Sequence, residues 1–463
     1  MLLAETLAIL MVVAVVVALM AGYPVALTLA GISLVFAVAG NALGVMSFAI
    51  LGALPQRIFG VMTNEVLLAI PLFIFMGVML ERSRIAEDLL ETMGRLFGTL
   101  RGGLGISAVI VGTLLAAAKG VVGATTVTMG LIMLPAMLRF GYDPRLAAGT
   151  VAATATLAQI FPPATVLVLL GDQLGNSYQA AQLSKGIFAP RSLTVSDLFA
   201  GALVPGFMLV ALYLLFLIMV AILRPRASPA LPRDPKATRG PALVRRLAEV
   251  LVAPLALIVA VLGSILGGIA TPTEAASIGA VGAIALAAHR TPLPILLRPV
   301  CEKTIQIVSM IFLILIGATM FSLVFRALGG DDMVHRALSN LPGGLAGAVL
   351  AVMLAMFLLG FVMDAFEIIF VVVPIVAPTL LAMPGVDPVW LGIMMAVNLQ
   401  TSYMHPPLGP TLFFLRSVAP PQITTRHIYV GIIPFVLIQL FALVVLWFAP
   451  SLATALPHTL YAN

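Results

Sequence analysis

Long apolar runs separated by short polar stretches occupy most of this chain. A helix needs about 20 predominantly apolar residues to cross the hydrocarbon core of a bilayer. The pattern predicts an all-α protein with about ten full spans and two re-entrant hairpins. The predicted spans are 6–21, 25–40, 66–80, 146–170, 199–223, 247–267, 273–288, 304–325, 389–415 and 428–449, and the predicted hairpins are 104–137 and 343–380.

Two of these spans contain a proline pair. Asp143-Pro144 precedes Pro162-Pro163 by the same spacing with which Asp387-Pro388 precedes Pro406-Pro407, so the copies align without a gap at an offset of 244 residues. Proline lacks an N–H and clashes with the preceding turn, so each helix must break there. A break at membrane depth is tolerated only beside a cavity or a bound ion. Matching interruptions in two halves therefore indicate the binding site of a secondary transporter.

The repeat divides the chain into two halves joined by a polar linker. Residues 1–223 form the first predicted repeat and 247–449 the second, with a cytoplasmic linker at 224–246 and a periplasmic tail at 450–463. Each half crosses the membrane five times, so the second copy is predicted to be inverted, as alternating access requires. A duplication kept only for packing is the alternative. The predicted parts are scaffold helices 1–103 and 247–325, the hairpins 104–137 and 343–380, broken helices 146–170 and 389–415, and final helices 199–223 and 428–449.

Composition supports a polytopic membrane protein. Hydrophobic residues make up 62% of 463 residues and charged residues only 9%, and the mean hydropathy is +1.17. A water-soluble domain of this size cannot bury so much apolar surface. The single cysteine, Cys301, excludes an internal disulfide and a cysteine metal cluster. The first run has no basic segment before it, so a retained helix is expected rather than a signal peptide.

The distribution of basic residues predicts the orientation. If both termini are periplasmic, eighteen of the 24 Lys and Arg residues lie on the cytoplasmic side and five outside, with Lys119 at a hairpin tip. The positive-inside rule favours this arrangement.

Polar groups beside the two breaks are the candidate cation ligands. Freed carbonyls and nearby hydroxyls form a cage of neutral oxygens that suits Na⁺. An alternative for each hydroxyl is a hydrogen bond to its own helix. The candidate cation-site residues are Gly120, Gly123, Thr154, Thr156, Pro162, Asp364, Asn398, Thr401, Ser402 and Pro406.

A second set could contact substrate. These residues are Lys119, Thr125, Thr126, Gln159, Gln400 and His405. Lys119 could receive a carboxylate or extend to the cytoplasmic interface, and His405 could polarise the site or be structural. Asp364 and Glu367 share a helix face within an apolar hairpin, so they could hold a cation or take up a proton. The alternative places one or both of them near the membrane surface as solvated acids.

No nucleotide-binding or zinc motif is present, so an ion gradient is the expected energy source. Nearly the full chain resembles the DctM type, the large membrane subunit of tripartite ATP-independent periplasmic (TRAP) transporters. The resemblance depends on the segments Gly22-Tyr23-Pro24-Val25-Ala26, Ile70-Pro71-Leu72-Phe73, Gly120-Val121-Val122-Gly123-Ala124-Thr125, Gln159-Ile160-Phe161-Pro162-Pro163, Gly268-Ile269-Ala270-Thr271-Pro272-Thr273-Glu274-Ala275 and Asn398-Leu399-Gln400-Thr401-Ser402.

This resemblance implies a multi-pass protein of the bacterial inner membrane and an elevator-type fold like that of the ion transporter superfamily. It implies Na⁺-coupled import of a small organic carboxylate, a small four-helix membrane subunit and a periplasmic substrate-binding protein as partners. The extended segment Asp172 to Asp197 is expected outside, where it could dock the binding protein or be a plain loop. Lys119 departs from the small or hydroxyl residue expected there. The alternatives are a stand-alone ion-coupled anion carrier and a membrane-embedded enzyme using Asp364, Glu367 and His405.

Overall fold

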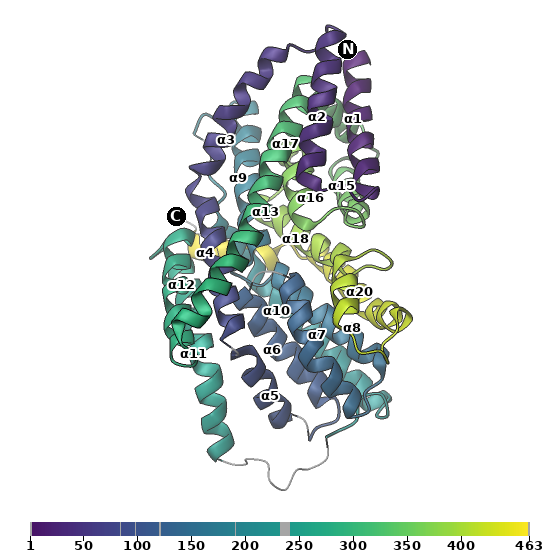
Figure 1. The fold of residues 1–463 in the computed structure, drawn as a ribbon. Coiled ribbons are helices and arrows are strands. Elements are labelled where there is room, and N and C mark those ends of the chain that lie inside the picture. Colours follow the sequence, from purple (N-terminus) through teal and green to yellow (C-terminus); the bar gives the residue numbers. More distant parts are fainter. Residues whose placement is uncertain are drawn as a thin grey trace.

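The structure is a computed structural model that describes residues 2–83, 85–97, 99–119, 122–189, 191–231 and 241–461. Within these ranges the regular structure is entirely helical, as the apolar pattern predicts. Figure 1 shows an elongated bundle in which helices from distant parts of the sequence lie side by side, for example α8 beside α20. For description the helices are divided into two groups, the frame helices (α1–α5 and α11–α14) and the central helices (α6–α10 and α15–α21).

The frame helices of each half pack on those of the other half. Helix α2 packs against α13, α4 against α12, α5 against α11, and α1 against α14. Each half therefore covers apolar faces that the other half presents. The frame helices are α1 (Leu2–Met20), α2 (Val25–Ala42), α3 (Leu54–Met62), α4 (Glu65–Arg82), α5 (Ile85–Phe97), α11 (Pro241–Leu266), α12 (Pro272–Ala288), α13 (Leu293–Ala327) and α14 (Gly330–Ser339).

Two helical hairpins lie among the central helices. The first consists of α6 (Gly103–Lys119) and α7 (Val122–Arg139). The second consists of α15 (Gly344–Leu359), α16 (Ala365–Val371) and α17 (Val373–Ala382), with a bend of 57° between α16 and α17. Both occur where the sequence predicts an interrupted apolar run.

Both proline pairs break a helix, as predicted. Helix α8 (Pro144–Thr156) continues as a single 3₁₀ turn, η2 (Leu157–Gln159), and the chain becomes helical again at α9 (Thr165–Ser184). Helix α18 (Pro388–Tyr403) is likewise separated from α19 (Pro410–Val418), and both Pro-Pro peptide bonds are cis. The remaining central helices are α10 (Val195–Leu223), α20 (Thr425–Phe448) and α21 (Ser451–Tyr461).

The two broken spans begin in the same way. Asp143 accepts a hydrogen bond from the Arg145 N–H at 2.7 Å, and Asp387 accepts one from the Val389 N–H at 2.8 Å. In each case a proline occupies the first helical turn, where its missing N–H removes no helical hydrogen bond. The Asp-Pro steps are therefore helix starts, which explains why they precede the proline pairs at a fixed spacing.

Some connections are more helical than expected. Helix α9 continues to Ser184, so most of the segment Asp172 to Asp197 is helix rather than an extended connection. Packing of α9 against α4 and α17 stabilises this polar stretch in a helix. Similarly, α13 begins at Leu293, well before the expected residue 304, and α11 begins within the expected linker. The connections before α4 and after α13 contain the short helices α3 and α14, and the tail contains α21.

Six helices in the described part of the chain are long and apolar enough to cross a membrane, or eight if each of two bent pairs is one span. The halves of the proline-broken spans are not among them. Helices α8, α18 and α19 are too short, and α9 reaches 20 residues but continues into a polar stretch. These broken spans contain helices that are buried along almost their full length. Every residue of α18 after Pro388 is buried, as is every residue of α8 after Arg145.

Candidate functional site

The ends of α8 and α18 meet at the centre of the molecule. The Gln400 side-chain amide on α18 donates a 3.3 Å hydrogen bond to the hydroxyl of Thr156, the last residue of α8. The two residues are 244 positions apart, which is the offset of the repeat. The Thr156 hydroxyl also lies 3.9 Å from the sulfur of Met404, beside the second break. The two broken spans thus contact one another at matching positions, although 244 residues separate them in the sequence.

A buried polar network extends from this contact. The Tyr213 hydroxyl on α10 contacts Thr156 and accepts a 2.7 Å hydrogen bond from the Gln439 amide on α20. Tyr213, Gln400 and Gln439 are fully buried. Our sequence analysis missed Tyr213 and Gln439. The signal for Gln439 was a lone amide within an apolar span, because polar groups at membrane depth usually have a role.

Several neutral oxygens near the breaks remain without a hydrogen-bond partner among the described residues. They are the side-chain carbonyls of Gln159 and Gln400 and the hydroxyl of Thr411 at the start of α19. Burying a polar oxygen without a partner is costly. Uncharged oxygens of this kind are ligands that an alkali cation accepts, so the donor set fits Na⁺ as a transported ion.

Most candidate hydroxyls donate to carbonyls of their own helices. Thr154, Thr156 and Thr126 make such bonds at 2.7–2.8 Å, and Thr401 and Ser402 do so at 2.7 and 2.9 Å. This matches the alternative that each hydroxyl bonds to its own helix. A hydroxyl that donates in this way keeps a lone pair, so it can still accept or coordinate.

The second hairpin is joined closely to the second break. A Cβ on Gly360, at the end of α15, would collide with the Ser402 hydroxyl, so only glycine allows this approach. The Asn398 amide donates a 2.8 Å hydrogen bond to the carbonyl of Met353 on α15. Asn398 and Ser402 therefore fix α18 against the hairpin, whether or not they also contact an ion.

Asp364 and Glu367 form the N-terminal cap of the short helix α16. The Glu367 carboxylate accepts from the Asp364 N–H at 3.0 Å, and Asp364 accepts from the Ala365 N–H at 2.5 Å and from the Tyr403 hydroxyl at 2.7 Å. Glu367 is only 5% exposed. The alternative of a solvated surface acid is therefore wrong for Glu367. The pair stabilises the hairpin tip and connects it to the end of α18.

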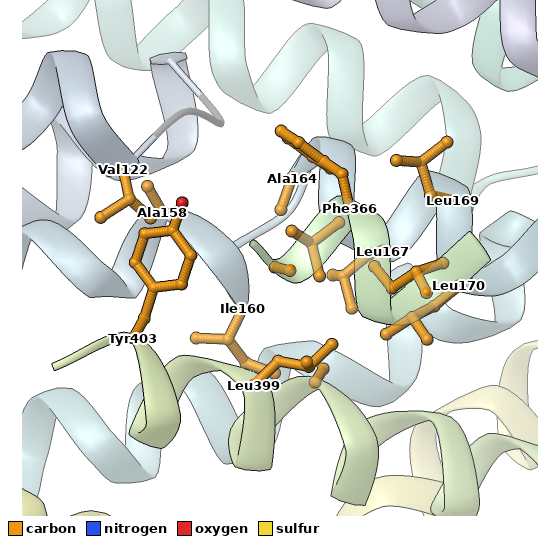
Figure 2. Close-up of a cluster of buried hydrophobic side chains, with 14 of the residues drawn as sticks. Val122, Ala158, Ile160, Ala164, Leu167, Leu169, Leu170, Phe366, Leu399 and Tyr403 are labelled. Carbon is orange, nitrogen blue, oxygen red and sulfur yellow. The ribbon is translucent and has the colours of Figure 1, made fainter. Parts of the chain in front are cut away.

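The tyrosine of this contact lies directly beside the first broken span. Figure 2 shows Tyr403 and Leu399, both on α18, directed toward Ala158 and Ile160, with Phe366 of the second hairpin nearby. Tyr403 occupies the position that corresponds to Gln159 in the first copy. This apolar packing holds the two breaks at a fixed separation.

His405 lies between two aromatic rings of the second hairpin. Its ring centroid is 4.9 Å from that of Phe357 and 5.1 Å from that of Phe361. Its Nδ1 is buried and has no partner within the described ranges. The candidate cation-site residue Pro406 follows it in the break after α18, as Pro162 lies in the break before α9.

The first hairpin tip is only partly described. Gly120 and the side chain of Lys119 lie outside the described residues, so their roles remain predictions. Thr125 and Thr126 are buried on α7, one turn from the tip. A Cβ on Gly123 would lie 3.1 Å from the ring of Phe414 on α19, so this tip approaches the far side of the second break.

The described residues contain no group of three or more His, Cys, Asp or Glu side chains that could hold a metal ion. The candidate site is therefore built of neutral oxygens, amides and backbone, with the Asp364–Glu367 pair as its acidic component. This composition suits an alkali cation and a polar organic solute.

Comparison with known proteins assigns the family. Residues 11–452 match the family described as the DctM component of the tripartite ATP-independent periplasmic transporter. The chain is 30% identical to the C4-dicarboxylate TRAP transporter large permease protein DctM of Rhodobacter capsulatus over 85% of this chain and 87% of that protein. It is 25% identical to the ectoine TRAP transporter large permease protein TeaC of Halomonas elongata over 94% of this chain and 95% of that protein.

The fold is similar to that in the crystal structure of the Alcanivorax borkumensis YdaH transporter. The TM-score is 0.60 at 16% identity, covering 86% of this chain and 88% of that chain. The family match, the full-length relatives and the arrangement of the broken spans agree. The chain belongs to the DctM family, the large permease component of tripartite ATP-independent periplasmic transporters.

Proposed function

We propose that this chain is the large permease subunit of a Na⁺-coupled importer of a small organic carboxylate. The observation that carries the proposal is the meeting of two broken spans at Thr156 and Gln400, beside buried oxygens without partners. Relatives named for C4-dicarboxylates and for ectoine share its length, so the substrate class, rather than one substrate, is proposed. Members of the family are permeases of the bacterial inner membrane and not enzymes, which sets aside the enzyme alternative.

The proposed cation ligands are the oxygens beside the two breaks. Thr154 and Thr156 serve the first break, and Asn398, Thr401 and Ser402 the second, together with backbone carbonyls freed by the prolines. Gln159, Gln400 and His405 lie between the breaks and the hairpins and are the proposed substrate contacts. Lys119, Thr125 and Thr126 complete this set from the first hairpin tip.

The proposed mechanism is an elevator in which the central helices move against the frame helices. Two cavities line the boundary between the groups, one of about 450 Å³ bounded by α3, α4, α13, α9 and α17, and one of about 930 Å³ bounded by α4, α7 and α13. Side-chain hydrogen bonds cross this boundary at several points. Asn64 donates to Asp172 at 2.7 Å near the first cavity, and Thr128 donates to Glu81 at 3.3 Å near the second. Other bonds join Ser107 to Met93, Arg326 to Pro374 and Tyr461 to Leu266. The proposal therefore depends on the two cavities, which leave space for relative movement of the two groups.

The proposed partners are a small four-helix membrane subunit and a periplasmic binding protein that delivers the substrate. The proposed orientation has two inverted halves and periplasmic termini, with eighteen of the 24 basic residues inside. The segment Asp172 to Asp197, which includes the connection between α9 and α10, is the proposed docking segment for the binding protein.

The test is uptake by proteoliposomes containing the permease with its small subunit. Labelled succinate and the separately purified binding protein are added with or without an inward Na⁺ gradient. Uptake should require both Na⁺ and the binding protein. Equal uptake without the binding protein would favour the stand-alone carrier, and uptake that ignores the Na⁺ gradient would reject Na⁺ coupling.

A further inference from the structure

A polar cavity outside the junction of the broken spans contains two arginines. Its volume is about 450 Å³, and Arg57 on α3 and Arg326 at the end of α13 line the same wall. The opposite wall consists of α9 and the second hairpin, including Asn176, Ser177 and Pro374. The cavity therefore lies between the frame helices, which carry both arginines, and the central helices.

The two arginines are unequally neutralised. Arg326 forms an ion pair with Asp331 at 3.2 Å and donates to the Pro374 carbonyl at 3.3 Å. Arg57 lies close enough to Arg326 for the like charges to repel. Within the described part of the chain, Arg57 has no acidic partner. One guanidinium in this cavity thus lacks a counter-ion.

Asp172, the one carboxylate among the described residues that line the cavity, does not serve as that counter-ion. One oxygen of Asp172 accepts from the Asn64 amide at 2.7 Å, and the other accepts from the Gln173 amide at 2.8 Å. Its nearest donors are therefore neutral amides. Among the described residues Asp172 forms no ion pair with Arg57 or Arg326, and the cavity between the walls keeps a volume of about 450 Å³.

We propose that this cavity binds a carboxylate group of the substrate on the external side, with Arg57 as the principal ligand and Arg326 as its neighbour. The proposal rests on the proposed function and adds the residues that recognise the charge of the substrate. A guanidinium binds a carboxylate with two parallel hydrogen bonds, which an ammonium cannot do. Pockets for small molecules span roughly 300–1,000 Å³, so the cavity has space for a small organic acid.

Both walls supply further polar contacts. Asn176 and Ser177 on α9, and Thr319 on the same wall as Arg326, offer an amide and hydroxyls that can bond to the rest of a polar acid. Because one wall belongs to the frame and the other to the central helices, a bound acid would contact both groups. Movement of the central helices would then separate these contacts and release the acid.

The experiment measures binding directly. The full chain is purified with its small subunit in lipid nanodiscs, and thermal unfolding is followed while succinate is titrated at constant ionic strength. Wild-type protein should show saturable stabilisation. Arg57→Gln should raise the apparent Kd about tenfold or more, because hydrogen bonds to charged groups contribute about 1.5–3 kcal/mol. Arg57→Lys should give an intermediate loss, and it also serves if Arg57→Gln does not fold.

Two further variants make the result specific. Arg298→Gln removes an exposed arginine of α13 outside the cavity and should leave the Kd unchanged. Asp172→Asn removes the negative charge and keeps an amide-sized side chain, so succinate binding should stay equal or become tighter. If Asp172→Asn abolishes binding while Arg57→Gln does not change it, the cavity is a cation site and the proposal is overturned.

Uptake separates this proposal from the proposed function. If Arg57→Gln imports succinate with an unchanged KM, the anion site is wrong while the transporter assignment stands. If wild-type protein binds succinate through Arg57 but shows no Na⁺-dependent uptake, the site stands and Na⁺ coupling fails. If neither succinate, malate nor acetate stabilises the wild-type protein, the proposal is rejected.

Discussion

The two broken spans follow the same backbone plan but are held in place by different contacts. In the first, Thr154 bonds to its own helix and packs against Gly112 of α6 without a hydrogen bond to it. In the second, the corresponding Asn398 donates to Met353 of α15, and Tyr403 donates to Asp364 at the hairpin tip. Against its own hairpin, the first break is thus positioned by close packing, whereas the second has hydrogen bonds in addition to the close contact of Gly360 with Ser402.

The crossings of these spans with α10 and α20 differ in a similar way. A Cβ on Gly149 would collide with the backbone carbonyl of Gly431, and a Cβ on Gly431 would collide with that of Arg145. In the second copy, a Cβ on Gly392 would meet only the ends of the Leu198 and Leu174 side chains, at 2.8 and 2.9 Å. Backbone cannot yield as a leucine can, so the first crossing should tolerate less change.

The largest expected effect is the difference in apparent Tm between Gly149→Ala and Gly392→Ala. Forcing a methyl into tight packing costs typically about 1–3 kcal/mol, whereas alanine gains about 1 kcal/mol over glycine in helix propensity. Gly149→Ala should lower the apparent Tm of the purified protein by several degrees and reduce uptake. Gly392→Ala should lie near the wild-type Tm. Equal losses in both variants would show that the crossings are equally rigid.

The next largest effect is expected at the corresponding polar residues of the two breaks, Asn398 and Thr154. Asn398→Leu leaves the buried Met353 carbonyl without its donor, at a cost of about 1–3 kcal/mol. Thr154→Val removes a hydroxyl that bonds within its own helix, so its loss should be about 1 kcal/mol or less. Thermal unfolding without Na⁺ measures both values. A greater loss in Thr154→Val would contradict the assignment of hydrogen-bonded anchoring to the second break.

Tyr403→Phe should have a smaller effect on stability, roughly 1–2 kcal/mol, because it removes one hydrogen bond to the Asp364 carboxylate. The hairpin tip should become more mobile. Hydrogen exchange of the α16 amides should therefore increase in Tyr403→Phe relative to the exposed control Tyr23→Phe. Unchanged exchange at α16 would mean that the Asp364–Glu367 cap holds the tip without Tyr403.

The smallest structural effect is expected for alanine at Thr401, whose hydroxyl donates to the Val397 carbonyl. If its oxygen also coordinates Na⁺, Thr401→Ala should raise the half-saturating Na⁺ concentration severalfold with little change in Tm. Thr113→Ala on α6 is the matched control for a lost intrahelical bond. Na⁺ dependence identical in Thr401→Ala and wild type would remove Thr401 from the proposed cage.

Helix breaks, turns and helix caps could be predicted from the sequence, whereas contacts between helices distant in the sequence could not. The prolines predict both breaks, and Gly141 and Gly385, with φ of 80° and 86°, lie where the chain turns before each broken span. The Asp364–Glu367 cap has a recognisable spacing as well. The Tyr213–Gln439 bond joins residues 226 positions apart, and no periodicity encodes it. The length of α9 was missed because tertiary packing overrides the local preference of its polar residues.

The packing of the frame helices of one half on those of the other has a consequence for biosynthesis. Because α2 packs on α13 and α4 on α12, the surfaces of α2 and α4 stay uncovered until the ribosome has delivered the second half. During synthesis, the first half is therefore expected to be in the membrane before the helices that pack on α2 and α4 are present. Two separately encoded halves should accumulate only when they are made in the same cell.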